Sequence, residues 1–269
     1  MNDDKKRVHD FWNETSSGEE LYLTKPDKNG YNFQAQERYR LEGRMIFDFV
    51  NFSQSKNLNV LKIGVGLGAD YQEFAESGAN LTGIDLTERA VSYTKKRMEV
   101  FGLNSKLIVG DAENLIFDDE SFDIVYSWGV LHHSPNTEKA LNEVYRVLKK
   151  GGTAKIMIYH KWSIVGYMLW IRYALLRFRP WKGLNEIYYK YLESPGTKAY
   201  SKSSVIKMFM EYESVNIKTP LGHADLLESD VGQRHRGLIL KIAKKLWPRW
   251  LIKILFPNSG LGMLIKAVK

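Results

Sequence analysis

Three glycines follow a short apolar run near residue 60, and their spacing suits a loop that binds a ligand through its backbone. Residues 59–63 lead into Gly64, Gly66 and Gly68. Glycine allows a sharp turn after a strand and a close approach of a ligand, and the first amides of the next helix then face that ligand. With Ala69 the run also satisfies the G-x-G-x-x-G/A pattern of dinucleotide sites. The loop alone therefore does not indicate which nucleotide is bound, and tight packing without any ligand is an alternative explanation of the glycines.

Two carboxylates come after the next two apolar runs of the sequence. Asp85 follows the second run, about 20 residues after the glycine loop, where a carboxylate can accept hydrogen bonds from both ribose hydroxyls. It can also cap a helix that begins after Thr87, and the two roles are compatible. Asp111 follows the third run in the sequence Gly-Asp-Ala-Glu, at residues 110–113.

The glycine loop, Asp85 and the Asp111–Ala112 pair together resemble the class I S-adenosylmethionine (SAM)-dependent methyltransferases, in the branch that includes the ubiquinone and menaquinone C-methyltransferases. The resemblance covers residues 60–159. It implies that the glycine loop contacts the methionine part of SAM, that Asp85 holds the ribose and that Asp111 accepts from the adenine amine. The cofactor-binding residues that it implies are Gly64, Gly66, Gly68, Asp85, Leu86, Asp111, Ala112 and Ser127.

One position departs from the family pattern. The family usually has Asp or Glu two residues before the first glycine, where this sequence has Lys62. A second positive charge near the sulfonium of SAM would weaken cofactor binding or change the bound species. Alternatively, Lys62 points elsewhere and pairs with a carboxylate. We expect SAM binding to be retained, because the other motif positions are intact.

Three histidines are candidates for a general base. Methyl transfer from a sulfonium is an in-line displacement that depends on positioning and desolvation, so a base matters only if the acceptor must lose a proton. His132 and His133 follow the fourth apolar run and His160 follows the fifth, at the strand ends where ligands bind in open α/β sheets. We predict His160 as the base, with His133 second, since paired histidines are more often structural. No metal ligand set is predicted.

The elements that must position these residues alternate regularly between strands and helices. Strands are expected at residues 59–63, 80–84, 106–109, 122–127 and 153–159. Helices are expected at 70–77, 88–101 and 137–148, with Gly151 and Gly152 as the stop of the last. This alternation predicts an α/β, Rossmann-like, doubly wound parallel sheet. Residues 214–218 and 263–268 are expected to pair antiparallel at one edge, and the family resemblance implies the order 3-2-1-4-5-7-6.

The segments outside this core divide the chain into four predicted regions. Residues 1–56 form a helical arm with helices at 3–12 and 34–52, and residues 57–160 form the SAM-binding core. Residues 161–212 form a helical cap or lid with an aromatic-rich helix over 162–191, and 213–269 hold the edge strands and a basic insertion. Three aromatic residues of the arm either close over the cofactor or substrate or simply pack: Trp12, Tyr22 and Tyr31.

The charge of the chain is concentrated at its C-terminal end. The formal net charge is +8, and residues 234–269 contain Lys and Arg but no Asp or Glu. Residues 238–256 have the pattern of a basic amphipathic helix, which suits an anionic membrane surface, although an ordinary solvated face that covers the sheet edge is slightly favoured. Nucleic acid is not expected, because no reading motif is present.

Composition also indicates a compartment. The chain has no cysteine, its N-terminus lacks the apolar stretch of a secretory signal, and its most apolar run, 163–178, is interrupted by two arginines. We therefore expect a cytoplasmic protein; lipid binding by 238–256, if that alternative holds, would place it at the inner face of the membrane.

The predicted function is SAM-dependent methyl transfer to a small-molecule or lipid-like acceptor, such as a quinone, a phenolic compound or another amphiphile. A nucleotide-dependent oxidoreductase and a non-catalytic, membrane-associated protein of the same fold are the alternatives. The sequence does not indicate an oligomeric state.

Overall fold

A computed structural model describes residues 3–104, 106–194, 196–228 and 244–269. Seven strands form one sheet in the order β3-β2-β1-β4-β5-β7-β6, in which only β7 pairs antiparallel to its neighbours. The strands are β1 Asn59–Ile63, β2 Asn80–Asp85, β3 Lys106–Val109, β4 Phe122–Trp128, β5 Leu148–Tyr159, β6 Ser214–Lys218 and β7 Gly262–Val268. The Rossmann-like sheet and its order are confirmed.

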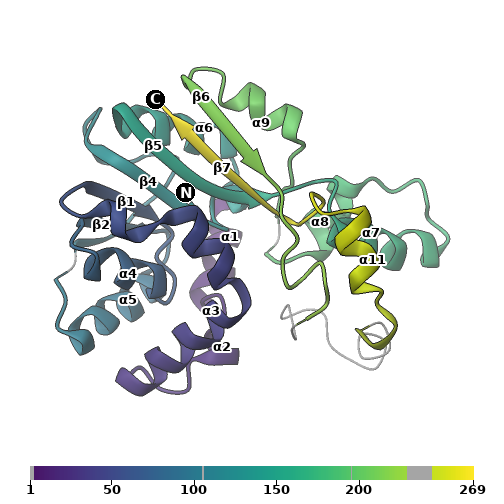
Figure 1. The fold of residues 1–269 in the computed structure, drawn as a ribbon, viewed down its shortest axis with the longest axis horizontal. Coiled ribbons are helices and arrows are strands. Elements are labelled where there is room, and N and C mark those ends of the chain that lie inside the picture. The colour runs from purple at the N-terminus through teal and green to yellow at the C-terminus, as the bar shows by residue number, and fades with distance from the viewer. Residues whose placement is uncertain (1–2, 105, 195, 229–243) are drawn as a thin grey trace.

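Both faces of the sheet are covered, which explains why the central strands are apolar throughout. Successive side chains of β1 point to opposite faces, so Val60 packs with Ile46 and Phe74, whereas Leu61 packs with Val144 of the other face. Helices α3 (Lys28–Val50), α4 (Ala69–Glu76) and α5 (Glu88–Phe101) cover the first face. Helices α6 (Thr137–Val147) and α9 (Lys202–Met208) cover the second (Figure 1).

Helix boundaries in the core follow from local capping residues. Thr87 accepts a hydrogen bond from the Ala90 amide at the start of α5, and Gly102 ends that helix in the left-handed region at φ 67°. Asn136 caps α6 in the same way through the Lys139 amide. These caps fix where each helix begins relative to the strand end before it.

The predicted helix stop at Gly151 and Gly152 is wrong. Helix α6 ends at Val147, and β5 begins directly at Leu148, which pairs with Phe122 of β4. The register between the two strands then shifts, and Gly151 lies inside β5 with φ 75°. The glycines serve a strand irregularity here, because only glycine adopts that backbone conformation without strain.

The N-terminal arm is helical, as expected, but longer than the sequence pattern indicated. It contains α1 (Asp3–Glu14), α2 (Glu19–Tyr22) and α3, followed by the 3-10 turn η1 (Phe52–Ser55). Helix α3 begins at Lys28 rather than at residue 34, because Asp27 accepts from the Gly30 amide at 2.8 Å and acts as its cap.

The cap is broken into shorter helices, so the single helix expected over 162–191 is wrong. Helix α7 (Ile164–Tyr173) leads into the 3-10 turn η3 (Leu175–Arg177), and α8 (Leu184–Tyr191) starts after Pro180 and Gly183. A residue with positive φ, Phe178 at 54°, ends η3. Helix α11 (Arg249–Leu255) lies with α7 and α8 on the right in Figure 1, away from α4 and α5. The rest of the predicted amphipathic segment, 238–243, lies outside the described residues.

Candidate active site

A cavity of about 280 Å³ lies at the carboxyl ends of the central strands, where the topology brings the predicted motifs together. The ends of β3, β2, β1 and β4 are neighbours in the sheet, so the loops that follow them meet. Seven of the eight predicted cofactor residues line the cavity: Gly64, Gly66, Gly68, Asp85, Leu86, Asp111 and Ala112. We call this part, over β1 to β3, the cofactor half.

The glycine loop has the backbone that its sequence predicted. Gly64, Gly66 and Gly68 have φ values of 77°, 54° and 82°. A Cβ atom on Gly64 would lie 2.1 Å from Val130 Cγ2, whereas one on Gly66 would meet nothing within 4 Å. Gly64 therefore serves close packing against the loop after β4, and Gly66 leaves open space on the cavity side.

Asp85 fixes this loop from the neighbouring strand. Its Oδ2 accepts from the amides of Val65 at 2.9 Å and Gly66 at 3.3 Å, and its Oδ1 accepts from the Thr87 amide at 3.0 Å. The Thr87 hydroxyl also donates to Oδ1, at 2.9 Å, so four local donors already occupy the roughly four acceptor positions of this carboxylate. Asp85 thus has the local bonds expected of it beside Thr87 and still lines the cavity.

Asp111, at the end of β3, is paired with a lysine that the sequence did not single out. Lys5 Nζ of α1 lies 2.5 Å from Asp111 Oδ2 and 2.7 Å from Glu113 Oε2. Burial alone would lower the pKa of Lys5, but the two carboxylates raise it overall. Helix α1 also contacts α5, where His9 Nε2 lies 3.1 Å from Glu88 Oε2. The arm therefore covers this end of the cavity.

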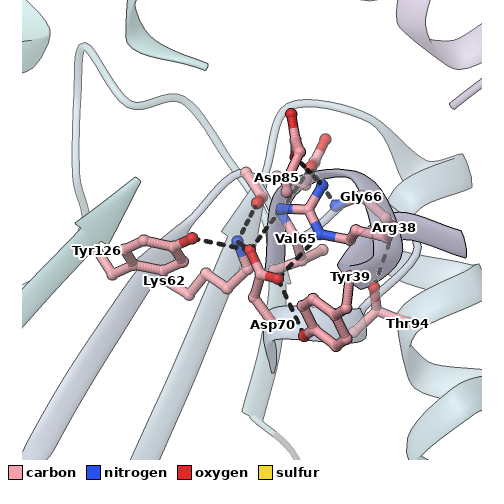
Figure 2. A network of polar contacts seen from close by, with 11 residues as sticks. Arg38, Tyr39, Lys62, Val65, Gly66, Asp70, Asp85, Thr94 and Tyr126 are labelled. Atoms are coloured by element: carbon pink, nitrogen blue, oxygen red, sulfur yellow. Dashed lines mark hydrogen bonds and ion pairs between the residues drawn. The ribbon is translucent and has the colours of Figure 1, made fainter. Parts of the chain in front are cut away.

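Lys62 lies beside the carboxylate of Asp70 (Figure 2). This is the arrangement expected if Lys62 pairs with a carboxylate instead of disturbing the cofactor. Its Nζ donates to the Gly64 carbonyl at 3.0 Å and lies 4.0 Å from Asp70 Oδ2. Asp70, on α4, also accepts two hydrogen bonds from Arg38, at 3.0 and 2.8 Å, and one from the Tyr126 hydroxyl at 2.8 Å. The family's usual acid is missing from β1, where Lys62 stands, and Asp70 of α4 supplies a carboxylate at this place instead.

The electrostatics of this cluster are balanced in formal charge. Arg38 and Lys62 are matched by Asp70 and by Glu42, whose Oε2 lies 3.3 Å from Arg38 Nη1. Burial lowers the pKa of Lys62 to about 8, because desolvation and the nearby Arg38 outweigh the attraction of Asp70. Burial would raise the pKa of Asp70, but the two cations hold it well below its usual range. The cluster therefore brings no excess positive charge to the glycine loop.

The other end of the cavity, over β4 and β5, is aromatic and contains a histidine–carboxylate pair. His133 Nε2 lies 3.4 Å from Glu193 Oε2, and the Tyr159 hydroxyl donates to the same oxygen at 2.7 Å. Ser194 Oγ lies 2.8 Å from His133 Nδ1 and orients the ring. The ring of Trp12 packs edge-on against His133, with centroids 5.3 Å apart. We call this part the acceptor half; it is lined by Trp12, Trp128, His133, Met157, Tyr159 and Glu193.

Four predicted site residues do not line the cavity. His160 is buried, and its Nδ1 lies 3.3 Å from the Gly260 carbonyl. Tyr31 is fully buried and donates to the Tyr93 carbonyl at 2.8 Å, so it packs in the arm. Ser127 is also buried, and Tyr22 lies outside the lining, whereas Trp12 and His133 belong to it. Of the two predicted bases, only His133 faces the cavity.

His132 extends the acceptor half into a possible ligand set for a metal ion. It is fully buried, its ring stacks 4.0 Å from that of Tyr159, and neither ring nitrogen has a hydrogen-bond partner among the described residues. Burial holds its pKa well below the usual range, so the ring is neutral. Ligand atoms of His132, His133 and Glu193 lie within 4.8 Å of one another. The sequence had predicted no such set, because Glu193 comes from the cap.

Comparison with known proteins identifies the central part of the chain. Residues 61–156 match the methyltransferase domain family. The sterol 4-C-methyltransferase of Caenorhabditis elegans is 32% identical over 107 residues, which cover 39% of this chain and 31% of that protein. The phthiotriol/phenolphthiotriol dimycocerosates methyltransferase of Mycobacterium leprae is 42% identical over 103 residues, which cover 38% of this chain and 37% of that protein. The matched part of the chain thus spans about a third of the length of these curated relatives.

A structural neighbour extends the likeness to the whole fold. Geranyl diphosphate C-methyltransferase from Streptomyces coelicolor A3(2) has a TM-score of 0.65 at 12% sequence identity, and the match covers 100% of this chain and 98% of the neighbour. At that identity the match concerns the fold alone, and it includes the arm and the cap.

Proposed function

We propose that this chain, whose residues 61–156 form a class I SAM-dependent methyltransferase domain, transfers the methyl group of SAM to a lipid-like or other amphiphilic small molecule. The observation that carries the proposal is the meeting of the glycine loop, Asp85 and Asp111 around one cavity. Three separate strand ends supply them, and the family spacing predicts all three. The quinone branch is one possibility within this proposal.

The residues of the cofactor half fit SAM or its product. Asp111 offers an acceptor for the adenine amine, Asp85 places its carboxylate at the cavity, where the ribose hydroxyls would compete with its local donors, and Gly66 leaves its side of the loop open. When bound, SAM supplies an electrophilic methyl group on a sulfonium. The arm covers the adenine end through Lys5 and excludes water from it.

The acceptor half supplies positioning and a base. Trp12, Trp128 and Met157 offer apolar surface to an acceptor, which gains free energy by leaving water. His133 Nε2 is buried, has no hydrogen-bond partner among the described residues and faces Glu193. In this proposal His133 takes a proton from an acceptor hydroxyl or acidic C–H, and Glu193 stabilises the imidazolium that results. His160, the base predicted from the sequence, lies outside the cavity lining.

The lipid-like acceptor is supported by the relatives and by the cap. The two relatives described above are named for sterol and phthiotriol substrates, and the structural neighbour was solved with geranyl diphosphate. The cap helices follow β5 directly, and the cap contributes Glu193 to the lining of the aromatic acceptor half. An amphiphile with an apolar body suits that surface better than a highly charged metabolite.

A membrane-facing surface for such acceptors lies on the cap and α11. Exposed apolar side chains alternate there with Arg177, Arg179 and Lys245, and residues 161–185 and 244–269 contain no Asp or Glu. That combination suits an anionic lipid surface. None of the helices in the described ranges is long and apolar enough to cross a membrane. The exposed apolar residues of these two ranges are Trp162, Tyr167, Ile171, Leu175, Leu176, Phe178, Trp181, Leu246, Trp250, Leu251, Ile254, Leu255 and Phe256.

Two measurements test the proposed function. Calorimetric titration with S-adenosylhomocysteine and with NADH should give saturable binding of the first and none of the second; the reverse result would favour an oxidoreductase. Incubation with methyl-tritiated SAM and a set of sterol, prenyl-quinone and phenolic lipids should transfer label to an extractable lipid. Binding without transfer to any of them would favour a non-catalytic protein of this fold.

A further inference from the structure

Lys62 is a buried cation whose hydrogen-bonding capacity is only partly used. Its side chain is 4% exposed and lines the cavity. Of the three donors of its ammonium group, one is given to the Gly64 carbonyl at 3.0 Å. Asp70 is too distant, at 4.0 Å, for a second strong bond. Among the described residues, the Gly64 carbonyl is its one hydrogen-bond acceptor, so a ligand in the cavity can take the remaining donors.

The neighbours of Lys62 leave it free to serve a ligand. Asp70 is already held by Arg38 and by the hydroxyls of Tyr39 and Tyr126, at 3.2 and 2.8 Å, so it does not depend on Lys62. The Lys62 ammonium also lies 4.7 Å from the centroid of the Tyr126 ring. This arrangement holds the ammonium beside the glycine loop, where it lines the cavity (Figure 2).

We propose that Lys62 binds the α-carboxylate of the methionine part of SAM, and thereby serves the cofactor with the opposite charge to the family's usual acid at this position. The inference rests on the proposed function, because it concerns the same cavity. The carboxylate is the negatively charged group of the methionine part of SAM and is attracted by Lys62. The sulfonium and the α-ammonium are positively charged, so Lys62 repels them. A hydrogen bond to a charged partner in a buried site contributes about 1.5–3 kcal/mol, or roughly a 10- to 150-fold change in affinity.

A pH dependence follows from the charges around Lys62. The groups around Lys62 are Arg38 of α3, Asp70 of α4, Asp85 at the end of β2 and Tyr126 of β4. Two further groups of α3 act on these neighbours, because Glu42 pairs with Arg38 and the Tyr39 hydroxyl donates to Asp70. Burial brings the pKa of free Lys62 to about 8, and a bound carboxylate would raise it. The charged form binds the carboxylate, so affinity for SAM should be full below pH 8 and should fall as pH rises through that value.

The test compares SAM with decarboxylated SAM, which lacks only the carboxylate, by calorimetry at pH 7. The wild-type chain should bind SAM at least about tenfold more tightly than the decarboxylated form. Lys62→Met should bring the two affinities to within about threefold, and Lys62→Arg should keep a clear preference for SAM. Lys155→Met is the matched control, because Lys155 is also a buried lysine with its pKa lowered to about 8, yet it lies outside the cavity lining.

The outcomes separate this inference from the proposed function. If the wild-type chain binds SAM but Lys62→Met retains the full preference, the inference is wrong and the proposed function stands. If the wild-type chain binds neither ligand, both are wrong. Should Lys62→Met fail to fold, the wild-type titration decides: the preference for SAM should shrink between pH 7 and pH 9, and a constant preference would overturn the inference.

Discussion

The two halves of the cavity are built in different ways. In the cofactor half, each functional group lies within a few residues of the end of the strand that positions it, as Asp85 does after β2 and Asp111 after β3. In the acceptor half, His133 and Glu193 are 60 residues apart and meet only because the cap packs against the sheet. Under the proposed function, the difference means that cofactor binding is specified by local motifs, whereas the reaction partner is specified by tertiary packing.

The largest expected effect is on stability, in the cofactor half. Asp70→Ala removes a buried carboxylate that holds Arg38 and Lys62, and leaving those cations unpaired should lower the free energy of unfolding by about 3–5 kcal/mol. Urea denaturation measures the loss. Glu76→Ala, an exposed acid of the same helix, is the control and should cost much less. Equal costs for the two variants would show that the cluster is not part of the core.

The same carboxylate gives a pH dependence with a definite sign. The pKa of Asp70 is depressed by Arg38 and Lys62, so its contribution to stability is complete above the ordinary carboxyl pKa of about 4 and is lost as pH falls below it. Unfolding of the wild-type chain should therefore become easier from pH 5 downward, and Asp70→Ala should show a shallower dependence. Parallel curves for the two proteins would contradict this account.

The sequence predicted the cofactor half and most of the fold, for a physical reason. Glycine spacing, strand ends and helix caps are local, so Gly64, Asp85 and the alternation of strands and helices could be inferred from the sequence, whereas the role of Asp111 and the sheet order followed from the family resemblance. Lys5 and Glu193 could not, because each is brought to the cavity by an element remote in sequence. His160 was expected in the site because it follows β5, but its ring turns toward Gly260.

The next effect concerns the acceptor half alone. His133→Gln should lower the rate of methyl transfer by roughly 100-fold or more, because a general base typically contributes that much. Glu193→Gln should act in the same direction, since the imidazolium loses its carboxylate. Rates of label transfer from tritiated SAM measure both. Glu186→Gln, which changes an exposed carboxylate of α8 paired with Lys182 and Lys190, is the control and should leave the rate unchanged.

A smaller effect is expected at the membrane-binding surface that we propose on the cap. Replacing Phe178 and Trp181 by Ser should weaken binding to vesicles containing phosphatidylglycerol by about tenfold, because their side chains are 87% and 76% exposed and would be buried on docking. Ile206→Ser with Met210→Ser, exposed apolar residues on and after α9, is the control pair. Equal losses for both pairs, or no sedimentation of wild-type protein with vesicles at low salt, would exclude the surface.

The smallest effect should come from metal removal. His132, His133 and Glu193 have the geometry of a ligand set, but our account gives His133 and Glu193 a role in proton transfer. Dialysis against a chelator should therefore leave the rate of methyl transfer unchanged. A loss of activity that zinc or manganese restores would reassign the three side chains to a metal centre.

The division of the cavity is tested most directly by calorimetric titration of S-adenosylhomocysteine into the wild-type chain, Asp111→Asn and His133→Gln. The account predicts binding by the wild-type chain, an affinity at least about tenfold lower for Asp111→Asn, and an unchanged affinity for His133→Gln. Absence of binding by the wild-type chain, or equal losses in the two variants, would contradict it.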